Sequence, residues 1–269
     1  MCWRRISLLA LWLSLGGSAW ASDAPPATWF VAPNQLQPLD ALPAALAQAR
    51  VVLVGETHPE YGDHLNQLTV LRQLYQQHSS RLVVGVEWFQ QPFQAVLDAY
   101  LAGKLDFAEL LIQSEYFQRW RYDPRLYQPV LSYLQRHQIP TLALNVPTEI
   151  SRKVGQGGLD ALTVAQRAQL PPLDTSDTVY RKRLEVVFKQ HPGRQSFEHF
   201  HTVQLLWDEG MAERAAAYLQ QHPEAVMLIF AGNGHLEYGS GIPQRLQRRL
   251  PQMKPVIILN GMDYLTPNR

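Results

Sequence analysis

The sequence predicts an α/β fold: a doubly wound, mainly parallel sheet with a helical insertion before the fourth strand. Short, nearly continuous runs of Val, Ile and Leu alternate with segments of helical periodicity, as expected for strands that are buried on both faces. Residues 147–224 are too long for a simple crossover and are mostly helical in pattern, which indicates the insertion. Five strands are expected, at Val51–Gly55, Leu82–Glu87, Thr141–Asn145, Val226–Ala231 and Val256–Leu259.

Helices are expected between these strands. His64–His78 has leucines and a tyrosine at helical spacing, and Pro92–Leu101 and Pro124–His137 each carry proline near a first turn. Within the insertion, Asp174–Gln190 and Ser196–Gln221 are the expected main helices. Such an insertion can form a lid over the edge of the sheet.

The beginning of the chain has the pattern of a secretory signal peptide. Arg4 and Arg5 precede the apolar run Ile6–Leu15, and Ala19-Trp20-Ala21 is a typical cleavage site. We expect a signal peptide at 1–21, a leader segment at 22–44 and one domain at 45–269, with the mature protein in the periplasm. The apolar run is too short for a transmembrane helix, and Cys2 stands at the wrong end of it for lipid attachment.

Composition excludes several classes of function. Cys2 is the one cysteine, so a chain cleaved after Ala21 has no disulfide and no thiolate metal site or nucleophile. No run of Lys and Arg interleaved with aromatic residues is present, which argues against nucleic acid as a partner. Motifs for a nucleophile elbow, a phosphate-binding loop and a zinc helix are also missing.

Polar residues follow the expected strands, where ligands bind in open α/β sheets. Glu56 and His58 follow the first strand, Glu87 ends the second, and the fourth runs into Gly232-Asn233-Gly234-His235. We expect Glu56, His58, Glu87 and His235 to share a crevice, as metal ligands, as acid/base groups or as structural pairs. A buried Glu87 needs a partner, which can be a metal, a cation such as Arg121, or a proton.

Other polar and aromatic residues carry less specific patterns. Asn145 can bond a site residue or cap the next helix, and His64 can face the site from its helix. His199 and His201 lie two apart on an expected helix, so we expect them to serve packing or the surface. The aromatic residues at 116–133 fit a core better than a cofactor pocket.

Six motifs occur in order along roughly residues 45–260. They are Gly55-Glu56-Thr57-His58, Gly85-Val86-Glu87-Trp88-Phe89, Tyr127-Gln128-Pro129, Leu142–Pro147, Gln204–Ala212 and Gly232–Pro243. With these motifs the chain resembles the ChaN-like haem-binding uptake family, within the TIKI/TraB and erythromycin-esterase-like superfamily.

The resemblance implies a protein that binds haem in bacterial iron acquisition, through a tyrosine that ligates ferric iron. It implies haem-binding roles for residues in or near the matching motifs, namely Tyr127, Tyr238, Tyr122, His58 and His235. It also implies that two copies can pair, and that other haem-uptake components are partners.

The wider superfamily contains hydrolases, which leaves a second hypothesis open. By motif, Glu56, His58, Glu87 and His235 would then bind a divalent metal or activate water in a peptidase or esterase. A third hypothesis is a binding module in which these polar strand ends only stabilise the edge of the sheet.

Overall fold

A computed structural model gives the fold and describes residue 46, residues 48–190 and residues 196–261. The expected signal peptide at 1–21 and leader at 22–44 lie outside the described residues. None of the helices in the described part of the chain has the length and apolar character of a membrane span.

The core is one five-stranded sheet in which every pairing is parallel, in the order β3-β2-β4-β1-β5. This confirms the expected doubly wound sheet. Its strands are β1 (Val51–Glu56), β2 (Leu82–Gln90), β3 (Thr141–Asn145), β4 (Val226–Gly232) and β5 (Val256–Ile258). The central strands β2, β4 and β1 are therefore neighbours, so the residues that follow them meet at one edge.

Strand β2 continues three residues past its expected end at Glu87, and all nine of its residues are buried. Its pairing with β4 stops at Val86, which is opposite Phe230, and its pairing with β3 shifts register between Val86 and Gln90. Glu87 therefore lies where β2 separates from β4, and its side chain can bond to the end of that strand.

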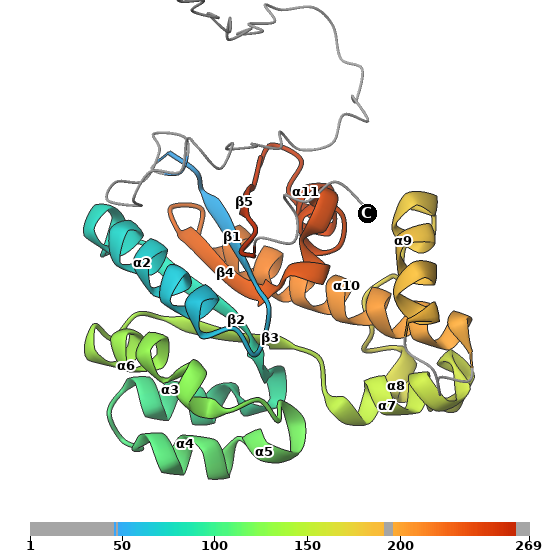
Figure 1. Cartoon of the computed structure of the whole chain (residues 1–269), viewed down its shortest axis with the longest axis horizontal. Helices are drawn as coiled ribbons and strands as arrows, with labels where there is room; N and C mark the ends of the chain where they lie inside the picture. The colour runs from blue at the N-terminus through green and yellow to red at the C-terminus, as the bar shows by residue number, and fades with distance from the viewer. Residues whose placement is uncertain (1–45, 47, 191–195, 262–269) are drawn as a thin grey trace, which may run out of the picture.

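Alternate residues of the strands contribute to two separate cores. Val52, Val54 and Phe230 belong to the core on one face, whereas Leu53 and Ile229 belong to the core on the other. The first core is covered mainly by helices from the first half of the chain (Figure 1). These helices are α2 (Tyr61–His78), α3 (Gln94–Leu101), α4 (Phe107–Gln113), α5 (Tyr116–Arg119) and α6 (Gln128–Arg136), with 3-10 turns η2 (Gln91–Phe93) and η3 (Pro124–Leu126).

The second face is covered by α10 (Phe197–Gln221) and α11 (Ile242–Arg249). The later half of α10 packs Met211, Ala215 and Leu219 onto the sheet. Its earlier half packs against α7 (Thr148–Gly157) and α9 (Thr178–Lys189) and near the 3-10 turn η4 (Leu159–Ala161). The insertion also contains the short helix α8 (Val164–Arg167). The expected insertion thus also supplies one layer of the domain.

Arg50, just before β1, caps the carboxyl end of α10. Its Nε donates to the carbonyl of Ala225 at 3.2 Å, and one terminal nitrogen donates to those of Leu219 at 2.8 Å and His222 at 3.2 Å. The last carbonyls of a helix lack partners within the helix and carry partial negative charge. The guanidinium satisfies them and connects α10 to the sheet.

We expect Arg50→Met to lower the free energy of unfolding by about 1.5–3 kcal/mol, because hydrogen bonds from a charged donor are lost. Urea unfolding of the purified protein measures this loss. Arg152→Met, at an exposed position in α7, is the matched control and should change stability by about 0.5 kcal/mol or less. Equal losses in both variants would contradict the capping role.

Candidate functional site

The ends of β1, β2 and β4 bring together the four polar residues expected there. Glu56 and His58 form one pair, with His58 Nδ1 2.8 Å from Glu56 Oε1. Glu87 and His235 form the second, with His235 Nε2 3.3 Å from Glu87 Oε1. Gly232 separates them, because its N–H donates to Glu87 at 2.7 Å and its Cα packs against the His58 ring.

The Glu56 carboxylate is buried and surrounded by donors. Gln67 Nε2 donates to it at 2.7 Å, Trp88 Nε1 at 3.1 Å and the Tyr127 hydroxyl at 3.3 Å. A buried carboxylate is tolerated when its oxygens are satisfied in this way. Glu56 therefore serves as a fixed support for the His58 ring.

His58 has one nitrogen engaged and one free. Nδ1 bonds Glu56, whereas Nε2 forms no hydrogen bond with the described residues, and the side chain is 24% exposed. The rings of Trp120 and Tyr122 flank it, with centroids at 4.8 Å and 4.7 Å. Burial opposes protonation, but the hydrogen bond to Glu56 and the charges of Glu87 and Glu56 outweigh it and raise the pKa of His58.

A side chain at position 232 would displace His58. A Cβ there would lie 2.9 Å from His58 Cε1 and 3.1 Å from Nε2. The glycine expected at this strand end therefore has a steric function, since it lets the imidazole lie directly over the backbone of β4.

His235 belongs to a buried chain of hydrogen bonds that starts at Tyr180 on α9. The Tyr180 hydroxyl donates to Asp208 Oδ2 at 2.5 Å, and Asp208 Oδ1 lies 2.6 Å from His235 Nδ1. Burial opposes a charge on His235, but Glu87 and Asp208 raise its pKa to about 10. Although burial acts the other way, His235, His58 and the Gly232 N–H lower the pKa of Glu87 to about 2.

The partner of Glu87 is thus His235. Arg121, the cation considered as a partner from the sequence, makes other contacts. Arg121 has a left-handed backbone with φ 72°, and its Nε donates to the carbonyl of Gln118. Trp120 and Tyr122 are the residues on either side of Arg121 in the sequence. The rings of both contact the His58 imidazole.

The segment after β4 is a tightly turned loop with the 3-10 turns η5 (Asn233–His235) and η6 (Glu237–Gly239). Tyr238 has φ 59°, a left-handed conformation that costs a residue with a side chain about 1–3 kcal/mol. Its side chain is 73% exposed. At Gly241, a Cβ would lie 2.2 Å from the carbonyl oxygen of His235, so the loop closes on itself.

Helix α11 is anchored beneath this loop by buried charges. Glu209 on α10 lies 3.2 Å from Arg245 Nε, and its oxygens are also 2.5 Å from Arg248 and 2.7 Å from Arg249. Arg245 and Glu209 are both fully buried, so removal of either partner would leave an uncompensated charge.

The structure places the three expected tyrosines differently. Tyr122 contacts His58, Tyr238 lies on the exposed loop, and Tyr127 is fully buried in the core. Burial and the charge of Glu56 raise the pKa of Tyr127 well above its usual value of 10. Its hydroxyl is used by Glu56 and by the carbonyl of His58, at 3.3 Å and 3.4 Å.

Of the remaining expected residues, His64 and Asn145 support the site through the backbone. His64 Nε2 lies 3.0 Å from the carbonyl oxygen of His58, and the Asn145 amide donates to the carbonyl of Glu87. His201 is buried against Phe197 and Tyr180, and His199 is half-buried.

Asp208, Tyr180, Trp88 and Gln67 were not expected in the site. Asp208 could have been found, because it lies in the matching segment Gln204–Ala212 beside other buried residues of α10.

Glu56, His58, Glu87 and His235 are held in pairs. Within the described ranges, no three His, Cys, Asp or Glu side chains form a group that could hold a metal ion. Their assignment as metal ligands stays a prediction.

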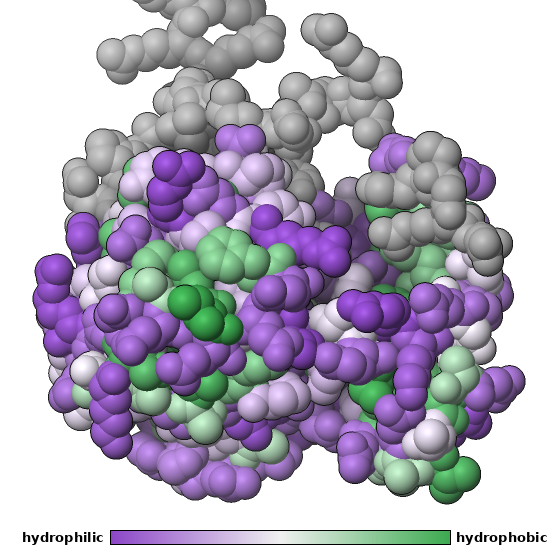
Figure 2. Space-filling model, turned by 90° about the horizontal axis from the view of Figure 1, so that it is seen from below, coloured by the Kyte–Doolittle hydropathy of each residue, from purple (hydrophilic) through white to green (hydrophobic). Residues whose placement is uncertain are grey.

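The arrowhead of β1 in Figure 1 points toward the face seen in Figure 2. On that face the surface is hollowed between the lobe of α3 to α6 and the smaller lobe of α7 to α9 (Figure 2).

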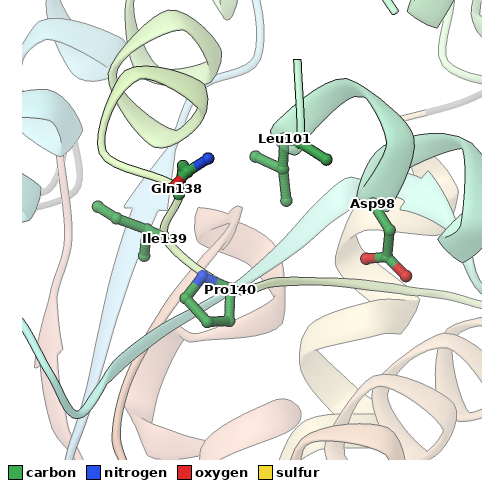
Figure 3. A pocket seen from close by; sticks show the side chains of 6 residues that line it. Asp98, Leu101, Gln138, Ile139 and Pro140 are labelled. Carbon is green, nitrogen blue, oxygen red and sulfur yellow. The ribbon is translucent and has the colours of Figure 1, made fainter. Parts of the chain in front are cut away.

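A separate pocket of about 250 Å³ lies at the amino end of β3, lined by Asp98, Leu101, Ala102, Gln138, Ile139 and Pro140 (Figure 3). This pocket lies at the opposite end of β3 from Asn145, and none of the site residues lines it.

Two solved structures are similar to this chain. ChaN of Campylobacter jejuni, described as binding haem cofacially, superposes with a TM-score of 0.64 at 18% identity, over 80% of this chain and 83% of that one. A mutant of the erythromycin esterase EreC in its open conformation gives a TM-score of 0.49 at 17% identity, over 80% and 71%. The first likeness shows a shared fold.

A plant relative and a family match complete the comparison. Protein RETICULATA-RELATED 5, chloroplastic, of Arabidopsis thaliana is 23% identical over 80% of this chain, which spans 31% of that protein's length. Residues 42–246 match the family described as Haem-binding uptake, Tiki superfamily, ChaN. The chain belongs to this ChaN family of the Tiki superfamily.

Proposed function

We propose that this protein binds haem at the carboxyl ends of its strands, and receives, holds or passes it in the periplasm during iron acquisition. Family membership supports the ligand class, and the signal-peptide pattern supports the compartment. The observation that carries the proposal is the free Nε2 of His58, held by Glu56 on one side and flanked by Trp120 and Tyr122.

The chemistry of these donors fits haem. An imidazole and a phenol are both accepted ligand classes for haem iron, and aromatic walls suit a flat apolar macrocycle. We propose His58 and Tyr238, which follow the neighbouring strands β1 and β4, as the residues that meet the haem. Trp120 and Tyr122, which flank His58, supply the aromatic surface.

Tyr238 is the proposed iron ligand among the three tyrosines. Its hydroxyl forms no hydrogen bond with the described residues and its side chain is largely exposed, so it is available to a ligand. Tyr127 is buried and donates to Glu56, so deprotonation would place two negative charges side by side. Burial, with the charges of Glu87 and Glu56, raises the pKa of Tyr122 and disfavours its phenolate.

The buried His235 chain fixes the loop that carries Tyr238. His235 is three residues before Tyr238 and is held on both sides, by Asp208 and Glu87. We propose that His235 acts through the backbone of this loop, while His58 orients the bound ligand with its free nitrogen.

The same Glu56–His58 pair supports a second candidate function, ester or peptide hydrolysis. A carboxylate on Nδ1 fixes the tautomer of an imidazole, and a free Nε2 can then take a proton from water as a general base. The hydrolase hypothesis in this form does not require the four residues to share a metal.

For haem binding, we expect hemin added to the purified protein to give a shifted Soret band. Tyr238→Phe should weaken binding at least about tenfold, or about 1.4 kcal/mol, whereas Tyr127→Phe should bind like the wild type. Tyr61→Phe, at another exposed tyrosine, is the matched control. Absence of the band in the wild type would refute haem binding, and a loss in Tyr127→Phe alone would refute the ligand assignment.

For hydrolysis, a panel of esters and peptides is assayed with and without chelator. If His58 is the base, His58→Ala should lower kcat at least about 100-fold, and chelator should have no effect. His222→Ala, at an exposed histidine, controls for general damage. Turnover that is absent or independent of His58 would remove this candidate.

For the His235 chain, stability should depend on pH with a defined sign. A pKa of Glu87 lowered to about 2 stabilises the fold above pH 4.5, and this stabilisation is lost as the pH falls toward 2. A pKa of His235 raised to about 10 stabilises it below pH 6.5, and this is lost as the pH rises toward 10.

We therefore expect the free energy of unfolding to be greatest between about pH 4.5 and 6.5 and to fall from pH 6.5 to 9. Urea unfolding at several pH values measures the slope. His235→Gln should be less stable overall but flatter above pH 6.5, whereas His222→Gln should keep the wild-type slope. The same slope in all three proteins would show that His235 is not held as the charged form.

A further inference from the structure

Arg183 connects helix α9 to the loop that carries Tyr238. One terminal nitrogen lies 2.8 Å from Glu237 Oε2, and the other donates to the carbonyl of Gly234 at 3.1 Å. The side chains of Arg183 and Glu237 are only 16% and 19% exposed, so solvent screens this ion pair less than a surface pair. A single guanidinium thus bonds the loop at two points, one on each side of His235.

The same guanidinium lies between two tyrosine rings. Its Cζ is 5.4 Å from the ring centroid of Tyr180 and 5.8 Å from that of Tyr238, both within cation–π range. Tyr180 is buried and starts the chain to Asp208 and His235, whereas Tyr238 is exposed. Arg183 therefore contacts both the buried support of the loop and its exposed aromatic ring.

The backbone of Tyr238 needs such a support. Its φ of 59° is unfavourable for a residue with a side chain, and Gly239 and Gly241, each at φ 69°, leave the following turn without side chains to pack. Within the part of the chain that the structure describes, the Arg183 guanidinium is the cation that lies over the Tyr238 ring. Lysine could not replace it, because an ammonium group lacks the planar fork that bonds two acceptors while it lies against a ring.

We propose that Arg183 is a positioning residue of the haem site, which holds the Tyr238 loop and ring in place for iron ligation without contacting the iron. This inference rests on the proposed haem function and on Tyr238 as the ligand. It assigns to the insertion helix α9 a part in ligand retention, through preorganisation of a loop that is distant in sequence.

The test uses hemin-loaded and hemin-free protein. Arg183→Gln should release hemin at least about fivefold faster, because loss of preorganisation acts mainly on dissociation, and should weaken the phenolate-to-iron charge-transfer band. Arg183→Lys should rescue neither. In the hemin-free protein, hydrogen exchange of the amides at 233–241 should become faster in Arg183→Gln, while that of α10 stays unchanged.

Arg181→Gln is the matched control. Arg181 is on the same helix but pairs with Glu198 and lies over Phe197, away from the loop. It should retain the wild-type release rate and band.

Two outcomes would overturn the inference while the proposed function stands. One is wild-type release and an unchanged band in Arg183→Gln when Tyr238→Phe abolishes the band; the other is an equal effect in Arg181→Gln. If the wild type binds no hemin, or if Tyr238→Phe behaves as the wild type does, the proposed haem ligation fails and the inference fails with it.

Discussion

The site depends on the need to pair carboxylates that are buried at the ends of the central strands. Glu56 on β1 and Glu87 on β2 lie on either side of β4 and are almost completely shielded from water, where an isolated negative charge would be prohibitively costly. Each is paired with a histidine and with additional donors. The two carboxylates therefore determine where His58 and His235 lie, and the rest of the site is built around these imidazoles.

The two imidazoles have different consequences because their second nitrogens differ. His235 is bonded on both sides, by Asp208 and Glu87, so it has no nitrogen left for a ligand. Its charge is balanced within the protein, and its effect is to fix the loop after β4. His58 is bonded on one side only and is partly exposed. The Glu87–His235 pair thus provides rigidity, whereas the Glu56–His58 pair leaves the Nε2 nitrogen of His58 free. The sequence motifs that contain the two histidines nevertheless look alike.

The sheet and the convergence of the four polar residues could be predicted because both follow from local rules. Apolar runs mark buried strands, and parallel strands end at a common edge. The matching segment Gln204–Ala212 marks Asp208, but its role could not be predicted from the sequence, because its partner His235 is brought to it only by the tertiary fold. The end of β2 was predicted too early for a related reason: Glu87 resembles a strand terminus until its buried partner is known.

The position of the tyrosines was the part least open to prediction. Tyr127 and Tyr238 both lie in family-like motifs, yet one is fully buried and the other largely exposed. The difference arises from backbone geometry. Tyr127 is the residue before α6, and its side chain points inward and donates to Glu56. Tyr238 adopts a left-handed conformation in a loop that Arg183 of α9 binds. The phenol of Tyr127 serves as a hydrogen-bond donor to a buried carboxylate, whereas the exposed phenol of Tyr238 forms no hydrogen bond with the described residues. The same residue type therefore supports the fold at one position and is available for ligand binding at the other.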